Sequence, residues 1–212
     1  MNEEIIKDLY NYNFDHIVID TNYSIEMSNR FDDYSLLQFT YGTTPFDTFN
    51  KIIESLDKKP KRFVVFGSSI GWQCFFWNHL FPDIPAVGYE LHDIRVNYAN
   101  VIIEKYNLSN IEFLNYDILD AELQDGDLIW ENNLCMDDDV CDEMNLYALS
   151  RYKDISIISY RAILPLFSES KLFSESYKIL IPSINNNFNS FNIKLKILPT
   201  SWVSDQDFHI LE

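Results

Sequence analysis

The feature that most constrains the fold is a regular alternation of short apolar runs with helix-periodic segments between residues 44 and 159. Some of these runs have the length and composition of buried strands. They are Arg62–Gly67, Ala86–Glu90, Ile111–Asp117, Asp127–Asn132 and Asp154–Ser159. Helical patterns occupy residues 44–56, 70–81, 91–106 and 137–152. This alternation predicts a doubly wound α/β fold with a mostly parallel sheet.

The two ends of the chain differ from its middle. The first forty residues mix polar, aromatic and short apolar stretches and predict a small cap with one or two helices. The tail holds strand-like runs at 177–183, 191–199 and 207–212, with an Asn-rich loop at 185–192. We therefore expect a seven-stranded Rossmann-like sheet with a C-terminal antiparallel strand pair. The cap would span residues 1–40 and the main domain residues 41–212.

Charge argues against nucleic acid as a partner. The chain has 212 residues, a net charge of −17 and a pI near 4.4, whereas nucleic-acid binders concentrate Lys and Arg. The one basic cluster, KKPKR at Lys58–Arg62, lies between a helix and a strand and is interpreted as a solvated turn. An acidic surface can instead steer basic substrates inward.

Other classes are also disfavoured. No run of about 18 apolar residues predicts a membrane span, and the acidic N-terminus does not resemble a signal peptide. The three cysteines lack paired metal spacing, which favours reduced thiols in the cytoplasm. The four histidines form no close pair, so no metal site is expected.

Candidate ligand-binding residues lie where the predicted strands end, because ligands of doubly wound sheets bind at the carboxyl ends of the strands. Gly67 and Gly71 in "FGSSIGW" suit a tight strand-to-helix turn with close backbone approach to a ligand. Glu90 ends the second run, at the spacing of an acid that binds ribose hydroxyls. Structural turns and a surface carboxylate are the alternatives.

The third and fourth runs end in further polar groups. Asp117 can accept a hydrogen bond from an adenine amino group, with Ile118 on the ring face. Glu131 and Asn132 end the fourth run and Asn133 follows it, and Asn side chains suit holding an amine. Helix capping and turn formation are the alternatives for these residues.

The pattern favours S-adenosylmethionine over NAD as cofactor. Ser69 stands where the dinucleotide fingerprint has its middle Gly, and the third Gly is missing. An acid after the third strand and an Asn pair after the fourth are typical of methyltransferases. The same fourth strand lacks the Pro-Pro-aromatic motif of enzymes that methylate bases.

The stretch "TYGTTPFD", residues 40–47, precedes the first helical pattern and has two interpretations. Thr44 can cap a helix whose first position is Pro45, with Asp47 completing a capping box. Alternatively, the stretch is a flap that closes over a ligand.

The ordered motifs "YGTTPFD", "FVVFGSSIG", "VGYE", "YDILD" and "ENNLCM" resemble the non-SET histone-lysine methyltransferase family, disruptor of telomeric silencing. The resemblance covers residues from about 40 to the end. It implies that Tyr41 and Asn132 shape a lysine channel, with Trp202 at its wall. It also implies a set of residues that bind S-adenosylmethionine: Tyr41, Gly42, Thr43, Thr44, Gly67, Ser68, Ser69, Gly71, Glu90, Asp117, Ile118 and Asn132.

The chain also departs from that family's pattern. Val65 replaces an acid that helps hold the cofactor's ammonium group, Thr43 replaces a Glu, and no basic tail for DNA is present. We expect methyl transfer to a lysine amine of a protein, with a basic tail as substrate. The alternatives are a methyltransferase acting on a small molecule and a binding module that has lost catalysis, which Val65 favours.

Overall fold

The computed structural model describes residues 2–30, 44–56, 58–133, 135–152, 154–160, 177–182, 188–193, 195–199 and 207–211. Tyr41, Gly42, Thr43 and Trp202 lie outside these residues, so their predicted roles are untested. In the described part of the chain, no helix combines the length and apolarity that crossing a membrane requires.

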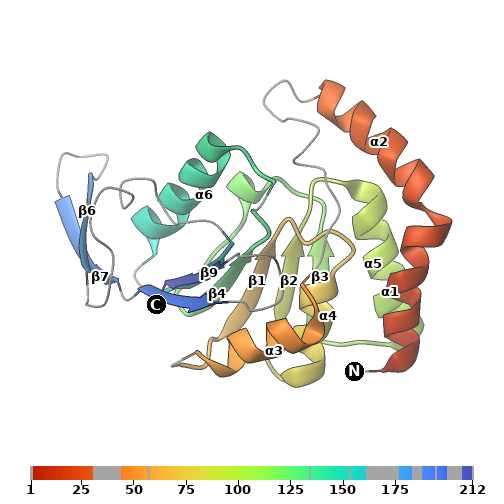
Figure 1. Ribbon diagram of the computed structural model, residues 1–212, viewed down its shortest axis with the longest axis horizontal. Coiled ribbons are helices and arrows are strands. Elements are labelled where there is room, and N and C mark those ends of the chain that lie inside the picture. Colours follow the sequence, from red (N-terminus) through yellow and green to blue (C-terminus); the bar gives the residue numbers. More distant parts are fainter. Residues whose placement is uncertain are drawn as a thin grey trace.

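Parallel strands form the centre of the molecule (Figure 1). They are β1 (Arg62–Phe66), β2 (Ala86–Tyr89), β3 (Ile111–Leu114), β4 (Asp127–Glu131) and β5 (Ser156–Ser159). They lie in the order β3-β2-β1-β4-β5. The α/β class and the predicted parallel core of five strands are therefore confirmed. The strand order reverses between β1 and β4, and this switch point is where doubly wound sheets bind ligands.

Helices cover both faces of the sheet (Figure 1). One face carries α3 (Phe46–Glu54), α4 (Trp72–Leu80) and α5 (Asp93–Tyr106), and the other carries the short helix η2 (Ile118–Asp120) and α6 (Asp138–Arg151). Successive side chains of β1 point to opposite faces of the sheet. Phe63 and Val65 therefore join the hydrophobic cluster on one face, and Val64 and Phe66 join the cluster on the other.

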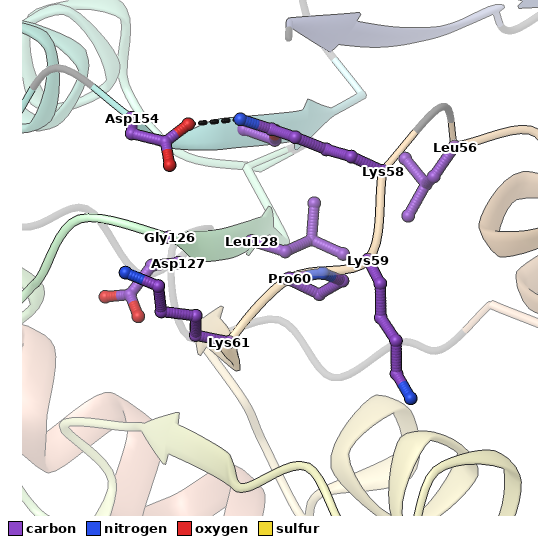
Figure 2. Close-up of a pocket in the computed structure, with 10 residues that line it drawn as sticks. Leu56, Lys58, Lys59, Pro60, Lys61, Gly126, Asp127, Leu128 and Asp154 are labelled. Carbon is purple, nitrogen blue, oxygen red and sulfur yellow. Dashed lines mark hydrogen bonds and ion pairs between the residues drawn. The ribbon is translucent and has the colours of Figure 1, made fainter.

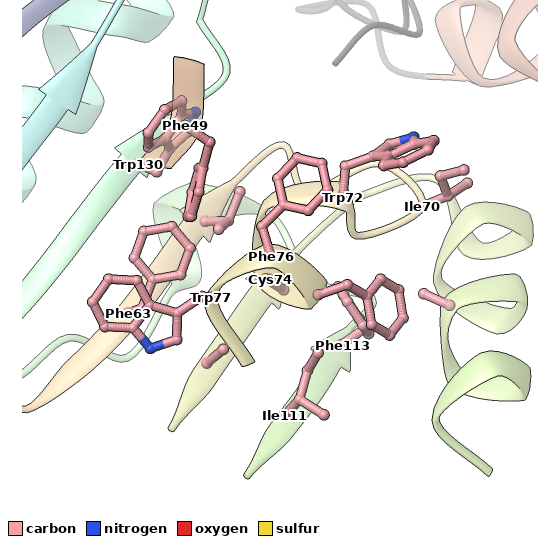
Figure 3. Packing of buried hydrophobic residues seen from close by; sticks show 14 of the residues in the cluster. Phe49, Phe63, Ile70, Trp72, Cys74, Phe76, Trp77, Ile111, Phe113 and Trp130 are labelled. Atoms are coloured by element: carbon pink, nitrogen blue, oxygen red, sulfur yellow. The ribbon is translucent and has the colours of Figure 1, made fainter. Parts of the chain in front are cut away.

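The core under α4 is aromatic (Figure 3). The rings of Phe63 and Trp77 stack with their centroids 4.5 Å apart, and Trp77 Nε1 donates to the Ile84 carbonyl at 3.2 Å. Phe49 lies 5.2 Å from the ring of Trp130. These rings fix α3 and α4 on the sheet, and thereby the loops that reach its carboxyl edge.

The start of α3 differs from the sequence prediction. Thr44 and Pro45 were expected as the N-cap and first helical residue, but the helix begins at Phe46 and Pro45 is its N-cap, without a side-chain cap bond. The Thr44 hydroxyl instead hydrogen-bonds the hydroxyl of Tyr160. The capping prediction for Thr44 is therefore wrong, because a tertiary partner takes its side chain.

The N-terminal residues form α1 (Glu3–Asp15) and α2 (Ile17–Arg30), and α1 lies alongside α5 (Figure 1). Tyr98 on α5 donates to the Asp8 carbonyl at 2.5 Å, and Lys105 donates to the Asp8 carboxylate at 2.6 Å. The rings of Tyr12 and Tyr98 meet edge to face at 4.8 Å. The expected one or two helices are thus present.

The C-terminal strands are β6 (Tyr177–Pro182), β7 (Phe188–Ile193), β8 (Leu195–Pro199) and β9 (Asp207–Leu211). Strands β6 and β7 pair with each other as a separate antiparallel ribbon (Figure 1). Strand β9 runs antiparallel to β5, and β8 runs antiparallel to β9.

Candidate functional site

The turn after β1 has positive φ angles, which residues other than glycine rarely adopt. Gly67, Ser69 and Gly71 have φ values of 67°, 52° and 94°, and Gly71 N donates to the Ser68 carbonyl at 2.8 Å. A Cβ on Gly71 would lie 2.2 Å from Cζ of Phe113, so only glycine fits there. The two glycines therefore make the tight turn that the sequence predicts.

Glu90 is held against this turn. One carboxylate oxygen accepts from Ser69 N at 2.8 Å, and the other accepts from His92 N at 2.9 Å. The Glu90 side chain is buried. Each carboxylate oxygen has two lone pairs, so both oxygens can still accept a hydroxyl hydrogen bond. The structure thus brings together the Gly turn and the acid that sequence analysis assigned to ribose.

The residues after β3 have local structural tasks as well. Asp117 is the N-cap of η2, and its carboxylate accepts from Leu119 N at 3.0 Å. Ile118 is buried in the core cluster that also contains Val87 and Tyr89. Both residues lie near the edge where Glu90 follows β2, because β2 and β3 are parallel neighbours.

Asn132, the residue after β4, ties three elements together. Its Nδ2 donates to the Gly67 carbonyl at 2.8 Å, and its Oδ1 accepts from Gln73 Nε2 and Trp130 Nε1, both at 3.1 Å. The side chain therefore has a fixed orientation beside the Gly turn. Gln73 was not assigned a role from sequence, although its place in the first turn of α4 puts it at this edge.

Tyr160, directly after β5, was also missed. It hydrogen-bonds Thr44, and its ring lies 6.2 Å from that of Trp130. Burial raises the pKa of Tyr160 to about 12, against the opposing effect of hydrogen bonds with Thr44, Trp130 and Gln73. The strand-end rule that selected Glu90 and Asn132 would have found Tyr160 if it had been applied to the fifth strand.

Tyr160→Phe tests whether this hydroxyl holds the residues ahead of α3 to the sheet. The loss of the hydroxyl and its part-buried hydrogen bond to Thr44 should reduce the free energy of unfolding by about 1–2 kcal/mol, measured by urea denaturation. Tyr116→Phe is the control, because Tyr116 is 56% exposed and should change little. Equal effects from the two substitutions would show that the Thr44 contact contributes nothing.

A second polar group lies at the ends of β4 and β5. Asn133 Nδ2 donates to Glu131 Oε2 at 3.1 Å and to Ser159 Oγ at 2.8 Å, while Asn133 Oδ1 accepts from Tyr160 N at 3.2 Å. Glu131 is fully buried, and burial raises the pKa of its carboxyl to about 8. Among the described residues, its Oε1 has no hydrogen-bond partner.

Val65 lies inside the sheet between Gly88 and Trp130, and its side chain is buried in the aromatic core. A carboxylate at this position would be surrounded by apolar groups, so Val65 suits the packing of this chain. Trp72 likewise packs on the ring of Tyr10, with centroids 5.0 Å apart.

A hollow of about 70 Å³ lies at the opposite, amino-terminal end of β4 and β5 (Figure 2). It contains much of the basic KKPKR cluster, in which Lys58 pairs with Asp154 and Lys61 Nζ donates to the Asp125 carbonyl at 3.2 Å. These half-exposed interactions agree with the interpretation of the KKPKR cluster as a solvated turn. Within the described residues, no cluster of His, Cys, Asp and Glu could hold a metal.

No family model matches the chain, and no curated protein matches it. Solved structures do. A single-residue variant of MtNAS in complex with S-adenosylmethionine is 11% identical, with a TM-score of 0.51 over 79% of this chain and 61% of that one.

Two other similar structures have lower TM-scores. An O-methyltransferase from a trans-AT PKS multienzyme of Brevibacillus brevis, in complex with S-adenosyl-L-homocysteine, is 15% identical (TM-score 0.46, 54% of this chain and 39% of that one). Geranyl diphosphate C-methyltransferase from Streptomyces coelicolor is 13% identical (TM-score 0.43, 53% and 45%). The chain thus spans less than two thirds of the length of any of the three. At 11% identity, the similarity to the MtNAS structure shows that the two chains share a fold.

Proposed function

We propose that the protein is an S-adenosylmethionine-dependent methyltransferase whose cofactor lies across the carboxyl ends of β1 and β2. The observation that carries this proposal is the Glu90 carboxylate, fixed by Ser69 N at the end of β2 with lone pairs left for ribose hydroxyls. MtNAS, which shares the fold, is a structure with S-adenosylmethionine bound. The Gly67–Gly71 turn offers backbone groups to the rest of the cofactor.

The remaining cofactor contacts are part of the same proposal. Asp117 and Ile118 would contact adenine, and the bond of Thr44 to Tyr160 would hold the predicted flap, residues 40–47, to the sheet. We also propose that β9 and β8 complete a seven-stranded sheet beside β5, with α1 and α2 as a cap on the domain of residues 41–212.

We propose a lysine amine of a protein as the methyl acceptor, in line with the resemblance to the disruptor of telomeric silencing family. The neutral amine nitrogen attacks the methyl carbon as the carbon–sulfur bond breaks, and the sulfonium becomes a thioether. Asn132, held by Gly67, Gln73 and Trp130, is positioned to orient that amine, so most of the catalysis is positioning. The net charge of −17 favours a basic tail.

The second candidate is a binding module that retains the fold without catalysis. The buried, apolar Val65 favours it, because the strand before the turn then offers no carboxylate to a cationic ligand. The two candidates differ in one respect that is simple to measure, which is methyl incorporation into proteins of a matched lysate.

Glu90→Ala tests the cofactor and its site together. Calorimetry should give micromolar affinity for S-adenosylmethionine and S-adenosylhomocysteine with the wild type, and no binding of NAD. Glu90→Ala should weaken both affinities by about 100-fold, since two hydrogen bonds to a charged acceptor are lost.

Glu112→Ala is the matched control, because Glu112 is an exposed carboxylate on the neighbouring strand β3. It should leave both affinities unchanged. A wild-type protein that binds neither compound would contradict the proposed function.

A further inference from the structure

We propose that Glu131 is an ammonium-binding carboxylate that receives the α-ammonium group of the cofactor. The inference rests on the proposed function and names a binding residue that sequence analysis did not place in the cofactor site.

The position of Glu131 is at the switch point of the sheet. It ends β4 and stands in register with Phe66, the last residue of β1 before the Gly67 turn. Asn132 N, the next amide along, donates to the Phe66 carbonyl at 3.0 Å. Glu131 is therefore adjacent to the turn against which the proposed cofactor lies.

The carboxyl group of Glu131 is incompletely satisfied. Its Oε2 accepts from Asn133, whereas Oε1 is buried and has no partner in the part of the chain that the structure describes. A buried polar atom without a partner is costly, so native proteins rarely keep one without a task. The open lone pairs of a carboxylate suit a donor that carries a positive charge.

The raised pKa of Glu131 has burial as its main cause, and no charged side chain of the described residues contributes to the shift. Its register partners on β1 and β5 are Phe66 and Ser159. Cys141 is the buried titratable side chain of α6. The acids of that helix and its N-cap are exposed or half-buried: they are Asp137, Asp138, Asp139, Asp142 and Glu143.

The raised pKa of Glu131 is what a buried carboxyl group without a neighbouring cation should have. Burial raises the pKa of its carboxyl to about 8, opposed by the hydrogen bond with Ser159. The group is therefore mostly protonated and neutral at pH 7. An ammonium group at Oε1 would favour the ionised form.

The cofactor is a better source of this ammonium than the methyl acceptor. An acceptor amine must be neutral to attack the methyl group, and a carboxylate beside it would hold it protonated. The cofactor's ammonium keeps its charge throughout the reaction. Met136 covers the turn, with Cε 3.2 Å from a Cβ placed on Gly67, and its flexible side chain can move as the ligand arrives.

Binding of the cofactor's ammonium group should release a proton from Glu131. The Glu131 carboxylic acid loses its proton to the buffer, and the resulting carboxylate accepts a hydrogen bond from the ammonium. No covalent bond forms or breaks. With a pKa of about 8, wild-type protein at pH 7 should release roughly 0.9 proton for each cofactor bound.

Calorimetry at pH 7 in two buffers of different ionisation enthalpy measures this release. We expect nearly one proton released on S-adenosylmethionine binding to the wild type and none with Glu131→Gln, whose affinity should be lower by roughly tenfold or more. The Gln side chain still accepts from Asn133, and equal thermal melting at pH 6 confirms that the variant folds. 5′-Methylthioadenosine, which lacks the amino acid, should bind both proteins equally and release no proton.

The outcomes separate the two proposals. Cofactor binding that is lost in Glu90→Ala but unchanged in Glu131→Gln, with no proton release, would overturn this inference and leave the proposed function standing. Proton release on binding of a lysine-bearing peptide instead of the cofactor would also overturn it, by moving Glu131 to the acceptor site. A wild type that binds no cofactor would overturn both.

Discussion

Replacing Asp20 by Asn is expected to lower the free energy of unfolding by roughly 3 to 5 kcal/mol. Asp20 on α2 accepts from Nε and Nη2 of Arg95 on α5, both at 2.7 Å, and from the Tyr12 hydroxyl at 2.5 Å. The carboxylate and the guanidinium are both buried. The variant removes the carboxylate charge that pairs directly with the buried Arg95 guanidinium, which costs far more than an exposed pair contributes.

The pH dependence of this pair has a definite sign. Burial alone would raise the pKa of Asp20, but the hydrogen bond and the charge of Arg95 outweigh it and lower that pKa. Its stabilising contribution is therefore present above the usual Asp pKa and is lost as the pH falls through the lowered value. The wild type and Asp20→Asn should converge in acid.

Asp8→Asn is the matched control. Asp8 also joins an N-terminal helix to α5, but its partner Lys105 is 52% exposed, and such pairs contribute at most about 1 kcal/mol. Urea denaturation gives the two free energies, and hydrogen exchange locates the effect. We expect protection in α1 and α2 to fall well before that of β1. Equal destabilisation by the two variants would show that burial of Arg95 is unimportant.

The predictions made from the sequence are confirmed where local interactions determine the structure. The five parallel strands follow from apolar runs bounded by polar residues, and the meeting of Glu90 with the Gly67 turn follows from the fixed polarity of a parallel sheet. Both inferences need only periodicity and spacing. Neither depends on which side chains meet across the core.

The predictions made from the sequence are wrong or missing where a side chain has a partner that is distant in the sequence. Thr44 fits a helix cap by every local rule, yet its partner is Tyr160, 116 residues further along the chain. The buried pair of Asp20 and Arg95 spans 75 residues and has no local signature. Such contacts are fixed by tertiary packing, which propensity and spacing do not encode.

Raising the pH from about 5 to about 9 should destabilise the wild type relative to Glu131→Gln by up to roughly 4 kcal/mol. The usual pKa of 4.5 rises to about 8 for the buried Glu131, at about 1.4 kcal/mol for each pKa unit. Between these two values the folded state binds the proton more tightly than the unfolded chain does. Stability from this group is thus full below pH 4.5 and is lost as the pH rises through 8.

The comparison of the two proteins isolates Glu131 from other titrations. The pKa of His92 is lowered by burial and by Arg95, so His92 acts in the opposite direction and equally in both proteins. Urea denaturation across this pH range should give two curves that meet in acid and diverge in base, with Glu131→Gln the more stable. Glu112→Gln, on the exposed face of β3, should follow the wild type throughout. Parallel curves for the wild type and Glu131→Gln would mean that Glu131 ionises near its usual pKa and that an interior cation or water already satisfies Oε1, which would leave no unmet need for a ligand's ammonium group.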